Sequence, residues 1–334
     1  MVYTTLVLSG GGAKGIIHLG VLQQYYEKKL LQDIKIGVGT SVGTIILYLL
    51  FIGYTPSEIF MESQLFDFQE FKDITDINIG KLLKNSGMIN IDILIQKIDY
   101  LSVQKIGYSP SLSELYELTG KELIVTTYNL TRGQSEYKSY HTDPDINCLD
   151  AIRLSCNIPI VFYKCIYDKC VYIDGAFIDN FPIEWTNNYV NSPETIDDEL
   201  DTILKTFTIT DNKKNILGIN IISDIPHLKA NCSLLSYILS IFSISFKENK
   251  VKSMKYDSPY VDVVTLKADG GMLELSLDIE TKLKYFKVGY ECKRTEVSEE
   301  RPDEVSEERP EEVSDKKEHK DDVELQKFRK EKRD

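Results

Sequence analysis

The chain has few of the features that mark metalloproteins and secreted disulfide proteins. Its six cysteines form no C-x-x-C pair and show no metal-ligand spacing, which favours reduced thiols and a cytosolic setting. The first residues predict a strand rather than a charged and then apolar leader, so we expect no signal peptide. These absences predict a cytoplasmic protein, peripheral to membranes at most, with no metal and no cofactor.

Long apolar runs are also missing. Residues 42–52 form an apolar stretch of about 11 residues, whereas a helix that crosses a bilayer needs roughly 20. In residues 234–246, Ser236, Ser240 and Ser243 recur at helical spacing and leave the rest of the helix surface apolar. This pattern predicts a core helix with a narrow polar stripe. The alternative is a lipid-facing lip that helps to lift substrate from a membrane.

The chain has fewer basic than acidic residues. The formal net charge is −13, of which residues 293–334 contribute −4 and residues 1–292 contribute −9. An acidic body does not favour nucleic acid or strongly anionic membranes as partners. Residues 296–303 are nearly repeated at 304–311, and this low-complexity segment has too few apolar residues to form a core. We therefore predict one globular domain, 1–292, followed by a disordered charged tail, 293–334.

What the chain does have is a glycine-rich loop near its start. Residues 4–9 are rich in β-forming residues, and a helical apolar pattern follows the loop. The loop consists of Gly10, Gly11, Gly12, Ala13, Lys14 and Gly15. A loop that joins a strand to a helix directs free backbone N–H groups out of the helix N-terminus. Such groups stabilise negative charge that develops on an oxygen atom.

A second glycine motif lies about 25 residues further on. Gly39, Ser41 and Gly43 form a G-x-S-x-G pentapeptide between a predicted strand at 34–40 and an apolar helical stretch at 44–52. Strand, sharp turn and helix in this order predict a nucleophile elbow, in which a strained turn exposes the serine hydroxyl. Glycine removes the Cβ atoms where helix and strand crowd together. Ser41 is therefore the candidate nucleophile.

A serine hydroxyl needs a base, and the chain has only four histidines. These are His18, His141, His227 and His319. The stronger candidate is Asp174, which follows a predicted buried strand at 171–173 and precedes Gly175 and Ala176. A carboxylate at a strand end is well placed to face a cleft. The alternative is an ordinary Asp-Gly turn, which is the commoner meaning of this dipeptide.

Other interpretations of these motifs fit less well. A dinucleotide-binding loop has an acidic residue at the end of the second strand, but that strand leads here into Ser41, and Asp33 precedes it. A P-loop has Lys and Ser or Thr after its last glycine, where this chain has two isoleucines. A triad of Ser41, Asp174 and His227 matches the α/β-hydrolase order, but that fold normally builds several strands before its nucleophile.

The glycine loop, the G-x-S-x-G pentapeptide and Asp174-Gly175-Ala176 together resemble the patatin-like phospholipases. The resemblance continues through residues 150–159 and 179–182, and residues 280–290 look like the last helix of the family. It covers most of residues 1–292 and is thin between about 55 and 120. It implies an α/β protein with a three-layer α/β/α patatin-like fold and a mainly parallel central sheet.

The resemblance also implies a Ser–Asp dyad with no catalytic histidine. On this chain Ser41 is the nucleophile, Asp174 is the general base, and Lys14 stands where the family has Arg or Lys. The oxyanion hole is formed by the backbone N–H groups of Gly10, Gly11 and Gly12. An aspartate has a reference pKa near 3.9, so burial would have to raise the pKa of Asp174 for it to act as a base.

We therefore expect a lipid acyl hydrolase of the phospholipase A type, acting on phospholipids or related acyl lipids at a transient membrane surface. The alternatives are an acyltransferase that uses the same acyl-serine and a catalytically silent lipid-binding or interaction module on the same fold. The acidic residues at 197–201 lack the spaced ligands of a calcium loop, so we expect activity without calcium. The sequence predicts no nucleic acid partner and leaves protein partners open.

Overall fold

The computed structural model describes residues 2–65, 79–191, 214–223, 232, 237, 240, 256–269 and 276–292. The chain divides into two compact units, Met1–Arg294 and Thr295–Asp334, and all described residues lie in the first. Three sequence predictions therefore fall outside the description: the charged tail, the acidic loop at 197–201 and, apart from positions 237 and 240, the serine-striped helix at 234–246. His227 and His319 also lie outside it.

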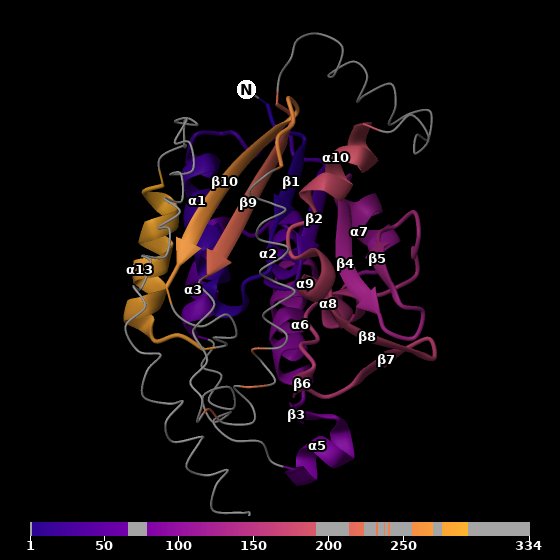
Figure 1. Cartoon of the computed structure of the whole chain (residues 1–334). Coiled ribbons are helices and arrows are strands. Elements are labelled where there is room, and N and C mark those ends of the chain that lie inside the picture. Colours follow the sequence, from indigo (N-terminus) through magenta and orange to yellow (C-terminus); the bar gives the residue numbers. More distant parts are fainter. Residues whose placement is uncertain are drawn as a thin grey trace, which may run out of the picture. The chain divides into compact units, whose positions relative to one another are not determined.

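One eight-stranded sheet organises the described residues (Figure 1). Its order is β10 (Val261–Ala268), β9 (Ile216–Ser223), β1 (Thr5–Leu8), β2 (Ile36–Thr40), β4 (Glu122–Asn129), β8 (Cys170–Asp174) and β7 (Cys165–Tyr167), and β5 (Gln134–Lys138) also pairs with β4. The first five strands are parallel to one another, whereas β5 and β8 run antiparallel to β4. The prediction of a mainly parallel sheet is confirmed.

Helices surround this sheet. They are α1 (Ile16–Glu27), preceded by the short 3-10 helix η1 (Gly12–Gly15), α2 (Val42–Phe51), α3 (Pro56–Leu65), α5 (Ile79–Asn85), α6 (Asp92–Ile106), α7 (Leu112–Thr119), α8 (Cys148–Ser155), α9 (Ala176–Asp179), α10 (Ile183–Asn191) and α13 (Ile279–Tyr290). A separate two-stranded sheet pairs β3 (Gly87–Ile89) with β6 (Ile160–Phe162). None of the helices within these described ranges is long and apolar enough to cross a bilayer.

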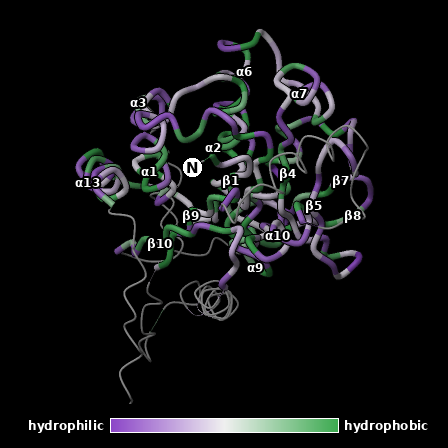
Figure 2. The backbone as a smooth tube through the Cα atoms, turned by 90° about the horizontal axis from the view of Figure 1, so that it is seen from above, coloured by the Kyte–Doolittle hydropathy of each residue, from purple (hydrophilic) through white to green (hydrophobic). Residues whose placement is uncertain are grey.

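Alternate residues of the strands enter two different cores. Leu6 and Leu8 of β1 belong to a large core shared with α1, α2 and α8, whereas Val7 belongs to a smaller core on the other face, shared with residues of α10. The sheet is therefore covered on both faces, as expected for an α/β protein with parallel strands. Viewed from above, α3 and α13 each carry both hydrophilic and hydrophobic residues (Figure 2).

Glycines on β2 bring α2 unusually close to the sheet. A Cβ atom at Gly37 would lie 2.6 Å from the ring of Phe51, and one at Gly39 would lie 2.6 Å from the backbone nitrogen of Thr44. Larger residues at either position would push the helix away from the strand. The β2–α2 connection can therefore turn within a single residue, Ser41.

Candidate active site

Ser41 occupies the turn between β2 and α2 in a strained conformation. Its φ of 54° and ψ of −125° lie in a region that non-glycine residues rarely adopt. Gly43 permits this turn because a Cβ atom there would lie 2.5 Å from the carbonyl oxygen of Leu8. The side chain of Ser41 lines a pocket although the residue is only 7% exposed.

Ser155, the last residue of α8, fixes the elbow. Its Oγ accepts a hydrogen bond of 2.9 Å from the N–H of Ser41 and donates one of 2.7 Å to the carbonyl oxygen of Thr126 on β4. Both of these contacts are buried. The strained turn is thereby tied to the neighbouring strand of the sheet through one hydroxyl group.

The strand register brings Asp174 to Ser41. Thr40 of β2 is the pairing partner of Thr126 on β4, and the next residue of β4, Thr127, pairs with Asp174 on the antiparallel strand β8. Ser41, which follows Thr40, therefore lies at the same level of the sheet as Asp174. The side chain of Ser41 is close enough to the carboxyl group of Asp174 to lower the pKa of that group.

The carboxyl group of Asp174 is buried and held in place. Asp174 is 2% exposed, and its Oδ1 accepts a hydrogen bond of 2.8 Å from the N–H of Ala176. Gly175 makes this approach possible, because a Cβ atom there would lie 2.5 Å from the carbonyl oxygen of Thr126. Burial raises the pKa of Asp174 to about 7, while the hydrogen bonds from Ser41 and Ala176 oppose part of that rise. A carboxylate with this pKa can take up a proton near neutral pH.

The glycine loop lies directly beside Ser41. A Cβ atom at Gly10 would lie 2.5 Å from Oδ1 of Asn180 and 3.3 Å from the Cβ of Ser41. The N–H of Gly10 donates to the carbonyl oxygen of Asn180 at 3.1 Å, so it is already occupied, contrary to its expected place in the oxyanion hole. Within the described ranges the N–H groups of Gly11 and Gly12 have no acceptor, and Gly12 has a positive φ of 56°. Gly11 and Gly12 are therefore the loop residues whose N–H groups are available as donors for the predicted oxyanion hole.

Lys14 and Gly15, at the end of the glycine loop, connect it to β9 and α2. Lys14 is only 1% exposed, and its Nζ donates a hydrogen bond of 3.0 Å to Oγ of Ser223 at the end of β9. The described lining of the pocket at Ser41 includes Gly15 but not Lys14. A Cβ atom at Gly15 would lie 2.5 Å from Cγ2 of Val42, so the start of α1 packs against the start of α2.

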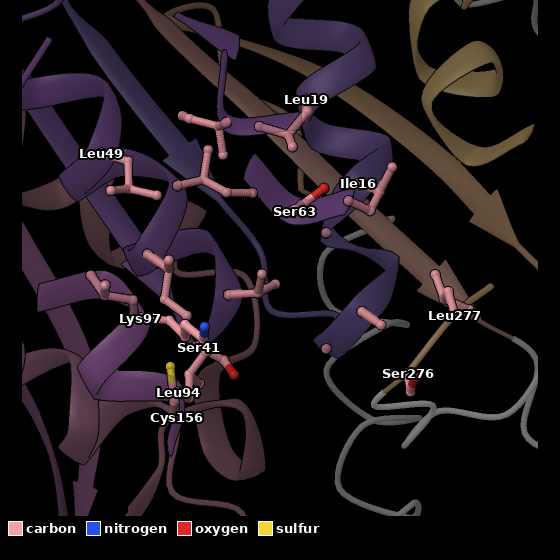
Figure 3. A pocket seen from close by; sticks show the side chains of 18 of the residues that line it. Ile16, Leu19, Ser41, Leu49, Ser63, Leu94, Lys97, Cys156, Ser276 and Leu277 are labelled. Atoms are coloured by element: carbon pink, nitrogen blue, oxygen red, sulfur yellow. The ribbon is translucent and has the colours of Figure 1, made fainter. Parts of the chain in front are cut away.

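An apolar pocket opens beside Ser41 (Figure 3). Its volume is about 180 Å³, and most of its described lining is aliphatic, with the largest share supplied by α1, α2 and α6. Ser41, Leu94 and Cys156 lie together in the view, and Ser276 and Leu277 lie across the opening. The thiol of Cys156 is buried and lines the pocket together with Ser41. The side chain of Ser41 therefore faces a space suited to a hydrocarbon chain.

Comparison with known proteins identifies the family to which this chain belongs. The model of the patatin-like phospholipase family matches residues 6–186, more than half of the chain. This chain belongs to the patatin-like phospholipase family. Members of this family are serine hydrolases, and the resemblance seen in the sequence is confirmed.

Two individual proteins that resemble this patatin-like protein are described as lipid-cleaving enzymes. It is 35% identical over 195 residues to a probable lipid hydrolase, 463L, of Invertebrate iridescent virus 6, a match that covers 57% of this chain and 65% of the viral protein. It is 28% identical over 163 residues to the triacylglycerol lipase SDP1L of Arabidopsis thaliana, covering 48% of this chain and 20% of that lipase. The match thus spans slightly less than two thirds of the viral relative and one fifth of the plant relative.

A solved structure supports the fold. The crystal structure of VipD from Legionella pneumophila matches with a TM-score of 0.51 at 16% sequence identity. The match covers 86% of this chain and 65% of VipD. At this level of identity the similarity shows a shared fold only.

The two described histidines of this patatin-like protein lie in other environments. His18 is fully buried in α1, where its Nε2–H donates to the carbonyl oxygen of Ser9 at 2.9 Å. Burial lowers the pKa of His18 to about 4, so the ring is neutral. His141 lies near the amino end of β4, where its Nε2 is 4.0 Å from Oε1 of Glu122. Ser41 therefore lies beside a carboxyl group, that of Asp174, whereas these two histidines contact Ser9 and Glu122.

Sequence reasoning missed the residues that brace this site. Ser155 and Cys156 lie in the segment 150–159 that carried the family resemblance, and Asn180 lies in the segment 179–182, but no role was expected for them. Their partners are distant in sequence: 114 residues separate Ser155 from Ser41. Within the described ranges, no group of three or more His, Cys, Asp or Glu side chains could hold a metal ion.

Proposed function

We propose that this patatin-like protein is a lipid acyl hydrolase in which Ser41 is the nucleophile and Asp174 is the general base. The observation that carries the proposal is the strand register, which places the carboxyl group of Asp174 beside Ser41, together with a pKa of Asp174 of about 7. A base with a pKa near the working pH combines a useful deprotonated fraction with enough basicity to accept a proton.

The proposed reaction has two steps. Asp174 takes the hydroxyl proton of Ser41 while Oγ attacks the ester carbonyl carbon; the alkoxy group then leaves with that proton as an alcohol, and the acyl group remains on Ser41. Asp174 next takes a proton from water, which attacks the acyl-serine. The fatty acid leaves, and the proton returns to Oγ of Ser41.

The glycine loop supplies the stabilisation of negative charge in this proposal. The N–H groups of Gly11 and Gly12 stand at the N-terminus of η1 and α1, where unpaired N–H groups and the helix dipole favour an anion. In other enzymes, the loss of one such donor to an oxyanion costs about 2.7–4 kcal/mol in the transition state. The bracing bond from Gly10 to Asn180 holds the loop in position without consuming these two donors.

The pocket suggests which lipid is bound. Its aliphatic lining suits one acyl chain, and the residues that line it in the described part of the chain include two lysines and no acidic residue. Lys97 is exposed on α6, and Nζ of Lys282 on α13 donates to the carbonyl oxygen of Ser63 at 2.6 Å. In a protein with a net charge of −13, this bias favours an anionic lipid, so we propose a phospholipid substrate rather than a neutral triacylglycerol.

Labelling with a serine-directed fluorophosphonate tests the nucleophile. The wild-type protein is expected to become labelled and to lose esterase activity, whereas Ser41→Ala is expected to remain unlabelled. Labelling of Ser41→Ala to the wild-type level would show that another residue is the reactive group.

A pair of lysine variants tests the substrate. Lys97→Gln is expected to lower kcat/KM about tenfold for a phospholipid and to leave a neutral short-chain ester unaffected, since hydrogen bonds to charged groups contribute about 1.5–3 kcal/mol. The matched control is Lys164→Gln, another exposed lysine, which does not line the pocket. If triacylglycerol and phospholipid of equal chain length are cleaved equally well, the phospholipid assignment fails while the hydrolase assignment stands.

A further inference from the structure

A second cavity lies on the other side of the sheet from Ser41. It has a volume of about 340 Å³ and is bounded by β5, the end of α9, α10 and Tyr256. Its apolar floor includes Phe181 and Ile183, which belong to the smaller core, whereas the pocket at Ser41 is lined by residues of the larger core. The two cavities are therefore separate spaces.

Aromatic rings form much of the wall of this second cavity. Tyr137 stacks on Trp185 with ring centroids 4.0 Å apart and an interplanar angle of 9°, and Tyr189 stacks on Trp185 at 4.9 Å and 12°. Tyr137, Trp185 and Tyr256 line the cavity. The two tyrosines cover the faces of the indole and hold it in one orientation, so Tyr137 and Tyr256 supply the aromatic surface that is left for a ligand.

The charge of the wall is negative. Among the described lining residues, Asp179 and Glu184 are acidic and none is basic. Oδ2 of Asp179 accepts a hydrogen bond of 2.7 Å from the hydroxyl of Tyr137, which fixes one carboxylate in the wall. Glu184 supplies a second carboxylate to the wall that Tyr256 also lines.

We propose that this cavity binds an organic cation of the quaternary ammonium class. Two carboxylates attract a positive charge, while aromatic and aliphatic walls suit a cation that carries an apolar shell and needs no hydrogen-bond acceptor. A bare inorganic ion would leave most of a 340 Å³ space unfilled and would find few oxygen ligands. The inference is independent of the hydrolysis proposed for Ser41.

The cavity also adjoins the catalytic segment. The carbonyl oxygen of Asp179 accepts a hydrogen bond of 3.0 Å from Oγ1 of Thr40, the residue before Ser41, and the carbonyl oxygen of Asn180 accepts from Gly10. The side chain of Asp179 therefore faces the second cavity while its backbone supports the nucleophile turn.

Trp185 provides a specific reporter, because it is the only tryptophan in the chain. The Ser41→Ala protein, which excludes turnover, is titrated with choline chloride at constant ionic strength while its tryptophan fluorescence is recorded. We expect a saturable change with choline and none with 3,3-dimethylbutan-1-ol, the neutral carbon analogue. Absence of a saturable change, or an equal response to the neutral analogue, would overturn the proposal.

Two variants locate the binding. Glu184→Gln, an exposed position, is expected to weaken choline binding at least about fivefold, and Tyr256→Leu is expected to do the same through loss of an aromatic wall. The matched control is Glu117→Gln, an exposed glutamate on α7 that does not line the cavity. Wild-type affinity in folded Glu184→Gln and Tyr256→Leu proteins would contradict the assignment.

The same titration distinguishes two sources of the ligand. If vesicles of phosphatidylcholine reproduce the fluorescence change and compete with choline, while phosphatidylglycerol vesicles do not, the cavity takes a lipid headgroup. If free choline binds and neither vesicle competes with it, the ligand is a soluble amine. Either result supports a site for quaternary ammonium groups.

Discussion

Two buried carboxylates at opposite ends of β4 have nearly the same pKa and very different neighbours. Glu122 begins β4 and Asp174 pairs with Thr127 near the other end of the strand; each residue is 2% exposed. Burial raises the pKa of each carboxyl group to about 7. The side chain of Glu122 accepts a hydrogen bond from Tyr189, whereas that of Asp174 accepts one from the N–H of Ala176 and lies beside Ser41. A raised pKa alone therefore does not identify a catalytic group.

What differs is the end of the sheet at which each carboxylate lies. Asp174 lies at the carboxyl ends of the parallel strands, where turns, helix N-termini and ligands gather in open α/β sheets. Glu122 lies at the amino end of β4, where its N–H donates to the carbonyl oxygen of Lys35 before β2 begins. Position relative to the nucleophile, more than acidity, separates a proposed base from a buried structural acid.

Replacing each carboxylate by its amide gives the largest expected difference. Asp174→Asn is expected to lower kcat by about 10²–10⁴-fold, since general base catalysis contributes that much, while Glu122→Gln leaves kcat unchanged. Steady-state hydrolysis of a short-chain ester measures both. A large loss of activity in Glu122→Gln, or none in Asp174→Asn, would reverse the assignment of the two carboxylates.

The pH dependence gives the next largest effect. Because Asp174 must be deprotonated to act, kcat/KM is expected to fall about tenfold per pH unit below pH 7 and to level off above it. A profile that stays flat from pH 5 to pH 8 would contradict the proposed base.

Stability is expected to change with pH in the opposite direction. The pKa of Asp174 rises from 3.8 in the unfolded chain to about 7 in the fold, so the folded protein binds the proton more tightly. The stability from this proton is fully present below pH 3.8 and is lost as the pH rises to about 7. Urea unfolding at pH 5 and pH 8 should therefore show Asp174→Asn gaining stability relative to the wild type at the higher pH. Glu122→Gln should gain in the same way.

Local sequence patterns predicted the elements that carry this site, but not the braces between them. The strand at 34–40 and the helix after Ser41 were predicted because apolar patterns and flanking glycines are local signals. The strand β5 and the short sheet of β3 and β6 were not predicted, since strands of three to five residues have little periodicity. The bond from Gly10 to Asn180 joins residues 170 positions apart, so no local pattern could show that this N–H is occupied.

The proximity of Asp174 and Ser41 is a second feature that local sequence patterns could not predict. The sequence places both residues at strand ends, but their contact depends on β8 running antiparallel to β4 and on the register that pairs Thr127 with Asp174. A shift by one residue would turn the carboxylate to the other face of the sheet. The family resemblance supplied this pairing as an expectation, and the catalytic roles of the two residues remain predictions.

Removing the hydroxyl of Ser155, which holds the turn at Ser41, is expected to lower kcat less than replacing Asp174 does. Ser155→Ala leaves the buried N–H of Ser41 without its acceptor, which costs about 1–3 kcal/mol, and loosens the nucleophile turn. Both the free energy of unfolding and kcat should fall, the latter about tenfold. Ser113→Ala on α7, whose hydroxyl contacts only Ser111 at 3.1 Å among the described side chains, serves as the control and should change neither. A Ser155→Ala enzyme with full activity would show that the turn holds its geometry without this bond.

The smallest expected effect is a change in stability when the hydroxyl of Tyr189 is removed at the amino end of β4. The hydroxyl of Tyr189 donates a hydrogen bond of 3.0 Å to Oε1 of Glu122 and lowers the pKa of that carboxyl group against the larger effect of burial. Tyr189→Phe is expected to cost about 1 kcal/mol of stability above pH 7, where Glu122 is charged, and less at pH 5, where it is protonated. Activity should stay at the wild-type level at both pH values. An equal loss of stability at pH 5 and pH 8 would mean that the hydroxyl stabilises both protonation states alike, and the shared pKa of the two carboxylates would then arise from burial alone.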